Sequence, residues 1–234
     1  LLSQEYIDTT IKDNNEFTLL MHACMYKNID VIKLFLPSET INEISKHGKT
    51  ALQIAVESEF VDVVQLLLAE DNIDINAGNA LEIAVDNGNI EIMQLLLDAG
   101  INVHTKDEEN RTALSYASNI EVFDILFNLD PTLEEKNIAF SFAILYSNLQ
   151  IAEKLLQNGV DINFKFNEIP LIYATLNENI DTIKFLLDHS VDISVVDKNG
   201  KTALMHAVEN NSTEIIQLFS RYNIEDEEEN IINF

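Results

Sequence analysis

A short block of residues recurs seven times along this chain of 234 residues. In its clearest form it reads TALQIAV at residues 50–56 and TALMHAV at residues 202–208. Successive blocks begin 26 to 33 residues apart, at residues 18, 50, 79, 112, 138, 169 and 202. A repeat of this length is typical of a solenoid, because each repeat cannot bury its apolar face alone and must stack on its neighbours.

A second, more apolar block follows each first block. It reads IDVIKLFL at residues 29–36 and IEIMQLLL at residues 90–97. It begins 11 residues after the first block in six repeats, and 8 residues after it in the fourth. Apolar residues at helical spacing, such as Ile29, Ile32 and Leu36, form a stripe along one side of a helix. The threonine that opens several first blocks is a suitable N-cap. We therefore expect each repeat to be a pair of short helices.

The repeats resemble those of the ankyrin family. The resemblance rests on the pattern Thr-x-Leu-x-x-Ala, a period near 33 residues, and the ends of the second blocks, LDAGINV at 97–103 and LQNGVDIN at 156–163. It implies an all-α solenoid with two rows of antiparallel helices, and with finger loops that form a concave groove beside one row. It also implies a module for protein–protein interaction that catalyses nothing.

Three segments follow from this resemblance. Residues 18–220 are expected to form seven ankyrin repeats in one solenoid domain. Residues 1–17 are expected to be a remnant of a preceding repeat or an N-terminal cap, and residues 221–234 an acidic cap or tail. Residues 1–2 resemble the end of a preceding second helix, so we expect the chain to be a slice of a longer protein or one trimmed at its start.

The chain also departs from the family pattern. The family's histidine after the block's leucine is replaced, for example by Gln53 and Glu82, so its usual hydrogen-bond network is in doubt. The fourth repeat lacks three residues at the end of its first helix. The loops before the first blocks vary in length, which predicts uneven fingers.

The net charge restricts the choice of partner. Fourteen Lys and Arg against forty Asp and Glu give a net charge of −26. Such a field repels nucleic acid and anionic membranes, so we expect neither as a partner. A basic protein or peptide would be attracted. The alternative interpretation is that the acidic surface serves solubility alone.

We expect a cytoplasmic monomer without a cofactor or a metal. Cys24 is the only cysteine, which fits a reducing compartment. No apolar run approaches the roughly 18 residues of a membrane span. Glycine-rich phosphate loops and the zinc patterns His-Glu-x-x-His and Cys-x-x-Cys are absent from the sequence. His22 and His206 share one repeat position and are interpreted as part-buried structural residues. We therefore predict no enzyme activity.

Binding is expected where large apolar residues occupy positions that the ankyrin pattern places on the groove. Leu145 and Tyr146 lie just after the conserved alanine of the fifth first block, and Leu176 lies just after that of the sixth. Phe166 lies in a finger, as do the basic residues Lys165 and Lys198. Exposed aromatic residues are enriched in recognition sites. A second set of candidates lies near the start of the chain and comprises Met25, Tyr26, Lys46 and His47. The alternative is that the register of the degenerate fifth repeat has slipped, which would place Tyr146 and its neighbours in the core.

The predicted function is a module that binds a protein or peptide, with a basic partner expected, in the concave groove. One alternative is the regulatory ankyrin segment of a larger effector, channel or enzyme. Another is a stand-alone acidic inhibitor of a basic partner, which the net charge of −26 favours.

Overall fold

The computed structural model describes residues 8–166 and 169–232, with side chains described up to residue 222. The expected remnant helix at residues 1–2 lies outside the described residues. The chain divides into two compact units, Leu1–Leu129 and Asp130–Phe234, which we call the first and the second unit.

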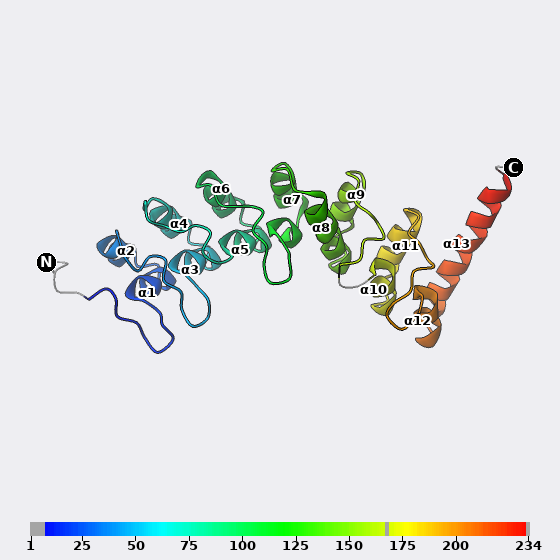
Figure 1. Cartoon of the computed structure of the whole chain (residues 1–234), viewed down its shortest axis with the longest axis horizontal. Helices are drawn as coiled ribbons and strands as arrows, with labels where there is room; N and C mark the ends of the chain where they lie inside the picture. The colour runs from blue at the N-terminus through cyan, green and yellow to red at the C-terminus, as the bar shows by residue number, and fades with distance from the viewer. Residues whose placement is uncertain (1–7, 167–168, 233–234) are drawn as a thin grey trace. The chain divides into compact units, whose positions relative to one another are not determined.

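The first unit is a stack of helix pairs (Figure 1). We call the first helix of each pair the inner helix and the second the outer helix. Each inner helix packs against the next one, α1 against α3, α3 against α5 and α5 against η2. The elements in chain order are α1 (Leu19–Met25), α2 (Ile29–Phe35), α3 (Ala51–Glu57), α4 (Val61–Leu68), α5 (Ala80–Asp86), α6 (Ile90–Asp98), the 3₁₀ helix η2 (Ala113–Tyr116) and α7 (Ile120–Phe127).

The second unit repeats this arrangement with three pairs. Its inner helices α8, α10 and α12 form one row, because α10 packs against both of the others. The elements are α8 (Leu133–Leu145), α9 (Leu149–Leu156), α10 (Pro170–Leu176), α11 (Ile180–Asp188), α12 (Ala203–Glu209) and α13 (Thr213–Ile232). The seventh second block and most of the acidic segment after it therefore belong to one helix, α13.

The expected all-α solenoid fold is confirmed. Within the described residues, β-pairing is limited to one isolated bridge between Lys12 and Thr18. The fourth repeat, which is three residues short, forms the 3₁₀ helix η2 in place of an α-helical inner helix. The missing residues correspond to most of one helical turn, so the shortened inner helix is a direct consequence of the deletion.

Threonine caps three inner helices as expected. The hydroxyls of Thr18, Thr50 and Thr202 each accept the backbone N–H three residues later. The carboxamide of Gln53 also accepts the N–H of Thr50 at 2.8 Å and donates to Asn79 at 2.5 Å. Gln53 thus links the second repeat to the third, at a position where the family carries histidine.

The start of the fifth inner helix differs from the prediction. We expected it to begin at Ile138, but α8 begins at Leu133 with Thr132 as its N-cap. The N–H of Thr132 donates to the Glu135 carboxylate at 2.6 Å, and the N–H of Glu135 donates back to the Thr132 hydroxyl. This reciprocal capping box stabilises the additional residues at the start of the helix.

The turns inside the helix pairs share one backbone conformation. Six of the seven pairs place a residue with positive φ just before the outer helix, and only one of these residues is a glycine, Gly88. Lys27 and Glu59 take the same left-handed conformation, which costs more for residues that carry a Cβ atom. In four of these six pairs an asparagine follows, as at Asn28 and Asn89, and its side chain accepts an N–H of the outer helix. Asn119 caps the outer helix of the remaining pair in the same way, without a positive-φ residue before it.

Among the described residues of the first unit, one carboxylate, that of Glu82 on α5, is buried. Burial raises the pKa of this carboxyl, with a further rise from the nearby Asp107. A pKa that is higher in the folded chain than in the unfolded chain means that folding is most favourable while the group is protonated. The resulting stability is present below the unfolded pKa of about 4.3 and is lost as the pH rises through the folded pKa.

Truncation of a buried outer-helix leucine is expected to destabilise the first unit strongly. Leu67 and Leu96 are fully buried, and such Leu→Ala changes cost about 2–5 kcal/mol. Leu96→Ala should therefore lower the urea midpoint markedly. The matched control is Leu133→Ala, whose side chain is 56% exposed and whose loss should cost about 0.5 kcal/mol or less. Equal midpoints for the two variants would contradict the assigned core face.

Neutralising the buried carboxylate is expected to stabilise the chain in a pH-dependent way. Glu82→Gln keeps the shape of the side chain and removes its charge, so the melting temperature should rise at pH 7 and change little at pH 4. Thermal unfolding at both pH values measures this difference. Glu108→Gln, at an exposed finger residue, controls for the change in net charge. A lower melting temperature for Glu82→Gln at pH 7 would show that the carboxylate stabilises the fold.

Candidate protein-binding surface

Three finger loops are built around an aspartate at the start of a tight hairpin. Asp13, Asp107 and Asp197 each accept the backbone N–H groups two and four residues later through one carboxylate oxygen. In each hairpin the backbone N–H of the aspartate also donates to the carbonyl four residues later, as from Asp197 to Lys201 at 2.9 Å. These bonds define the conformation of the finger before the inner helix begins.

The same aspartates hold the fingers to the inner helices. The second carboxylate oxygen of Asp13 contacts His22 Nε2 at 3.1 Å, and that of Asp197 contacts His206 Nε2 at 2.9 Å. The second oxygen of Asp107 accepts from the Tyr116 hydroxyl at 2.6 Å and also from Arg111 Nε at 2.6 Å. The backbone N–H of Lys201, together with the contact to His206, lowers the pKa of Asp197 to about 2. His22 and His206 are thus part-buried structural residues, as expected, and each orients a finger.

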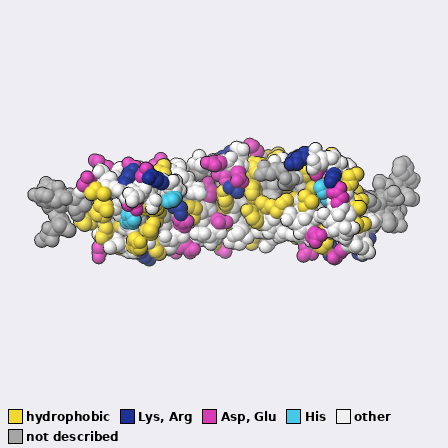
Figure 2. All heavy atoms as spheres, turned by 90° about the horizontal axis from the view of Figure 1, so that it is seen from below, with side chains coloured by type: hydrophobic (Ala, Val, Ile, Leu, Met, Phe, Trp, Pro, Cys, Tyr) yellow, Lys and Arg dark blue, Asp and Glu magenta, His cyan; other side chains and the backbone are white. Residues whose placement is uncertain are grey.

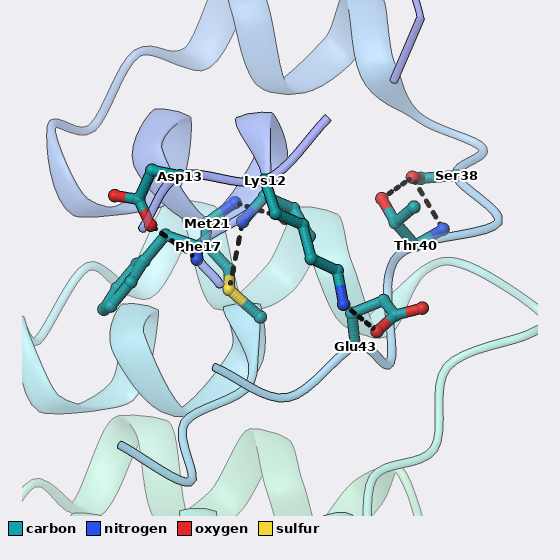
Figure 3. Close-up of polar contacts among 8 residues, drawn as sticks. Lys12, Asp13, Phe17, Met21, Ser38, Thr40 and Glu43 are labelled. Carbon is teal, nitrogen blue, oxygen red and sulfur yellow. Dashed lines mark hydrogen bonds and ion pairs between the residues drawn. The ribbon is translucent and has the colours of Figure 1, made fainter. Parts of the chain in front are cut away.

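The hairpin of the second finger does not begin with an aspartate. Ser45 replaces the aspartate and accepts the N–H of Lys49, and the inner-helix position that would face it is the apolar Ile54. Figure 3 shows the neighbouring first finger, where Asp13 accepts the N–H of Phe17 and Lys12 reaches Glu43 at 2.6 Å. Polar contacts therefore join one finger to the next within the first unit.

The apolar candidates of the second unit lie around the ends of its inner helices. Leu145 and Leu176 are the last residues of α8 and α10, and Tyr146 is the C-cap of α8. Tyr146 is 69% exposed and Leu176 46% exposed, whereas Leu145 and Phe166 are partly buried. Tyr146 is therefore a surface residue, so no slip of register places it in the core.

A buried aromatic residue supports this apolar surface. The Phe142 ring lies 6.2 Å from the Tyr146 ring and 5.9 Å from the Phe166 ring, measured between centroids. Phe142 is buried on the inner helix, so Tyr146 and Phe166 rest on a fixed side chain. We call Leu145, Tyr146, Phe166 and Leu176 the apolar patch. Figure 2 shows hydrophobic, lysine and histidine side chains on the finger side of the second unit.

A pocket of about 330 Å³ adjoins the patch, with which it shares Leu176. It opens between α10 and α12 and the fingers that precede them. Sequence reasoning placed Lys165 and Lys198 in fingers but did not predict the pocket, because it depends on the distance between two successive fingers. The residues that line it are Lys165, Ile169, Ile172, Leu176, Asp197, Lys198, Asn199 and His206.

The candidates of the first unit are less apolar as a group. Tyr26 is 75% exposed and Met25 37% exposed at the end of α1. Lys46 donates to the carbonyl of Asn14 at 2.7 Å, and the His47 ring lies 6.3 Å from that of Phe17. Lys46 and His47 thus contact the first finger, before the start of α1, whereas Met25 and Tyr26 lie at the end of this helix.

The cysteine of the chain, Cys24, is buried on α1. Burial raises the pKa of the Cys24 thiol to about 12, which keeps it protonated and unreactive at neutral pH. Among the described residues, no cluster of His, Cys, Asp and Glu could hold a metal ion. A search of the same residues finds no helix long and apolar enough to span a membrane.

Comparison with known proteins identifies the repeats. The family model described as "Ankyrin repeats (3 copies)" matches residues 1–79 and 140–230, and one described as "Ankyrin repeats (many copies)" matches residues 66–117. Together these matches reach almost every repeat.

Several curated proteins are similar to parts of the chain. "Ankyrin repeat, SAM and basic leucine zipper domain-containing protein 1" of Equus caballus is 36% identical over 77 residues, which cover 32% of this chain and 16% of that protein. A "Putative ankyrin repeat protein" of Borreliella burgdorferi is 24% identical over 114 residues, 49% of this chain and 51% of that protein. "Interferon antagonist OPG040" of Vaccinia virus is 34% identical over 85 residues, 36% and 30% of the two chains. The chain thus spans about half the length of these relatives or less.

Proposed function

This chain belongs to the ankyrin-repeat family, and we propose that it binds a protein or peptide along the finger side of its inner helices, without catalysis. Ankyrin repeats generally mediate protein–protein interaction, and the family is typically non-catalytic. The proposed contact surface is the apolar patch of the second unit, with Met25, Tyr26, Lys46 and His47 as the alternative surface in the first unit.

The observation that carries this proposal is the exposure of Tyr146 and Leu176 at the ends of two inner helices, α8 and α10, that pack against each other. Removing a large apolar side chain from water is favourable. An exposed group of such side chains is therefore typical of a site that another molecule covers. An aromatic side chain that is already held by a buried ring loses little conformational entropy on binding. Tyr146, supported by Phe142, meets both conditions.

The proposal extends to the partner and to the cellular setting. A net charge of −26 favours a partner of net positive charge, chiefly through a faster encounter. It disfavours nucleic acid and anionic membranes. A single, buried cysteine suits the reducing cytoplasm, where we propose that the chain acts as a monomer. An acidic inhibitor of a basic protein is a special case of this proposal.

A second proposal is that these repeats are the binding segment of a larger protein. The name of the horse relative places ankyrin repeats beside SAM and basic leucine zipper domains, and the similar segment covers only 16% of that protein. Sequencing the complete transcript tests this proposal. An open reading frame that encodes these repeats alone would contradict it.

Truncation of the central aromatic residue is expected to weaken binding and spare the fold. Loss of an aromatic hot spot commonly costs about 2 kcal/mol or more, so Tyr146→Ala should weaken affinity for an isolated partner at least tenfold. Its melting temperature should stay near that of the wild type, because an exposed side chain contributes little to stability. Titration calorimetry and thermal unfolding measure the two quantities.

Tyr26→Ala is the matched control, since Tyr26 is an equally exposed tyrosine at the end of an inner helix in the first unit. We expect it to leave the affinity unchanged. Weaker binding by Tyr26→Ala together with normal binding by Tyr146→Ala would place the interface in the first unit. Normal binding by both variants would exclude both surfaces.

A further inference from the structure

The pocket beside the apolar patch combines an apolar floor with a basic rim. Ile169, Ile172 and Leu176 from α10 and its N-cap form the floor. Lys165 reaches it from the finger before α10, and Lys198 from the finger before α12. Two successive fingers therefore direct one lysine each to the same pocket.

The charges around the pocket are unevenly paired. Asp197 is engaged with His206 and with two finger N–H groups, and the neighbouring Lys201 contacts Glu209 at 2.7 Å. By contrast, no carboxylate of the described residues forms an ion pair with Lys165 or Lys198. In a chain with 40 acidic and 14 basic residues, this pocket is lined by two lysines that form no ion pair with a described carboxylate, and by one aspartate whose carboxylate is already bonded.

The size of the pocket restricts its ligand. A volume of about 330 Å³ is at the lower end of the range of about 300–1,000 Å³ that ligand pockets span. It suits one or two side chains of a peptide better than a large cofactor. The apolar floor favours an aliphatic or aromatic side chain, and the lysines favour a carboxylate at the rim.

We infer that this pocket binds a segment of the partner in which a large apolar side chain lies next to an aspartate or glutamate. This inference rests on the proposed function and names the chemistry that the second unit recognises. The segment continues beyond the pocket, because the apolar patch shares Leu176 with the pocket and also includes Tyr146 and Phe166. The segment would continue along the patch after its acidic residue has met the lysines.

The acidic contact is compatible with a partner of net positive charge. Charges further apart than about 8 Å are largely screened at physiological salt, so net charge acts mainly on the encounter. Lys165 and Lys198 act at contact distance, where they determine which residues of the partner enter the pocket.

Selection from a random peptide library tests the inference. Twelve-residue peptides are displayed on phage, with their C-termini fused to the coat protein so that no terminal carboxylate is free, and are selected on the full chain. We expect enriched peptides to carry a large apolar residue within two positions of Asp or Glu. Synthetic versions with Asn or Gln in place of the acid should bind at least tenfold more weakly, and with less dependence on salt.

Charge reversal at the pocket completes the test. The double variant Lys165→Glu, Lys198→Glu should weaken the enriched peptides at least tenfold. The control, Lys33→Glu with Lys184→Glu, reverses two exposed lysines on the outer helices α2 and α11 and should leave affinity unchanged. All four lysines are exposed, so melting temperatures should match.

Enriched peptides that lack a carboxylate, or that bind the pocket variant normally, would overturn the inference, and so would a selection without enrichment. The proposed function is judged separately by Tyr146→Ala. If Tyr146→Ala weakens binding while the double lysine variant does not, the patch binds the partner, but the inferred contact between the lysines and an acidic residue of the partner is wrong. If neither variant weakens binding, both the inferred acidic contact and the proposed binding by the apolar patch are wrong.

Discussion

Burial of each inner helix against the next is the interaction on which each unit depends. Most inner helices here have only seven residues, too few to be stable alone in water. The valines at one repeat position show the effect of a neighbour directly. Val56 and Val85 are fully buried beside a following repeat, whereas Val208, on the last inner helix, is 55% exposed. Stacking, rather than helix propensity, therefore provides most of the stability.

Stacking also creates the proposed binding surface, because it sets successive inner helices and fingers of each unit side by side. Bonds from Asp197 to His206 and to the finger backbone then hold the last finger against α12. The consequence is a surface on which exposed side chains, such as Tyr146 and Lys198, occupy set positions. An arrangement that is ordered before binding loses less entropy when a partner arrives.

Much of this architecture could be predicted from the sequence, because apolar periodicity and threonine caps are local signals. The start of α8 was missed because the degenerate block at Ile138 masked the capping box of Thr132 and Glu135. The left-handed turn residues Lys27 and Glu59 were missed because their side chains do not signal that conformation, as a glycine does. The pocket could not be predicted from the sequence, because it depends on the spacing of two fingers in three dimensions.

Site-specific photo-crosslinking measures most directly whether the finger side of the second unit binds a protein. A photoreactive phenylalanine analogue at position 146 lies on that side, and the same analogue at the exposed position 184 lies on the outer helix α11. Our account predicts a covalent adduct with the partner from position 146 and none from position 184. An adduct from position 184 alone would show that the partner binds the outer helices and would contradict the account.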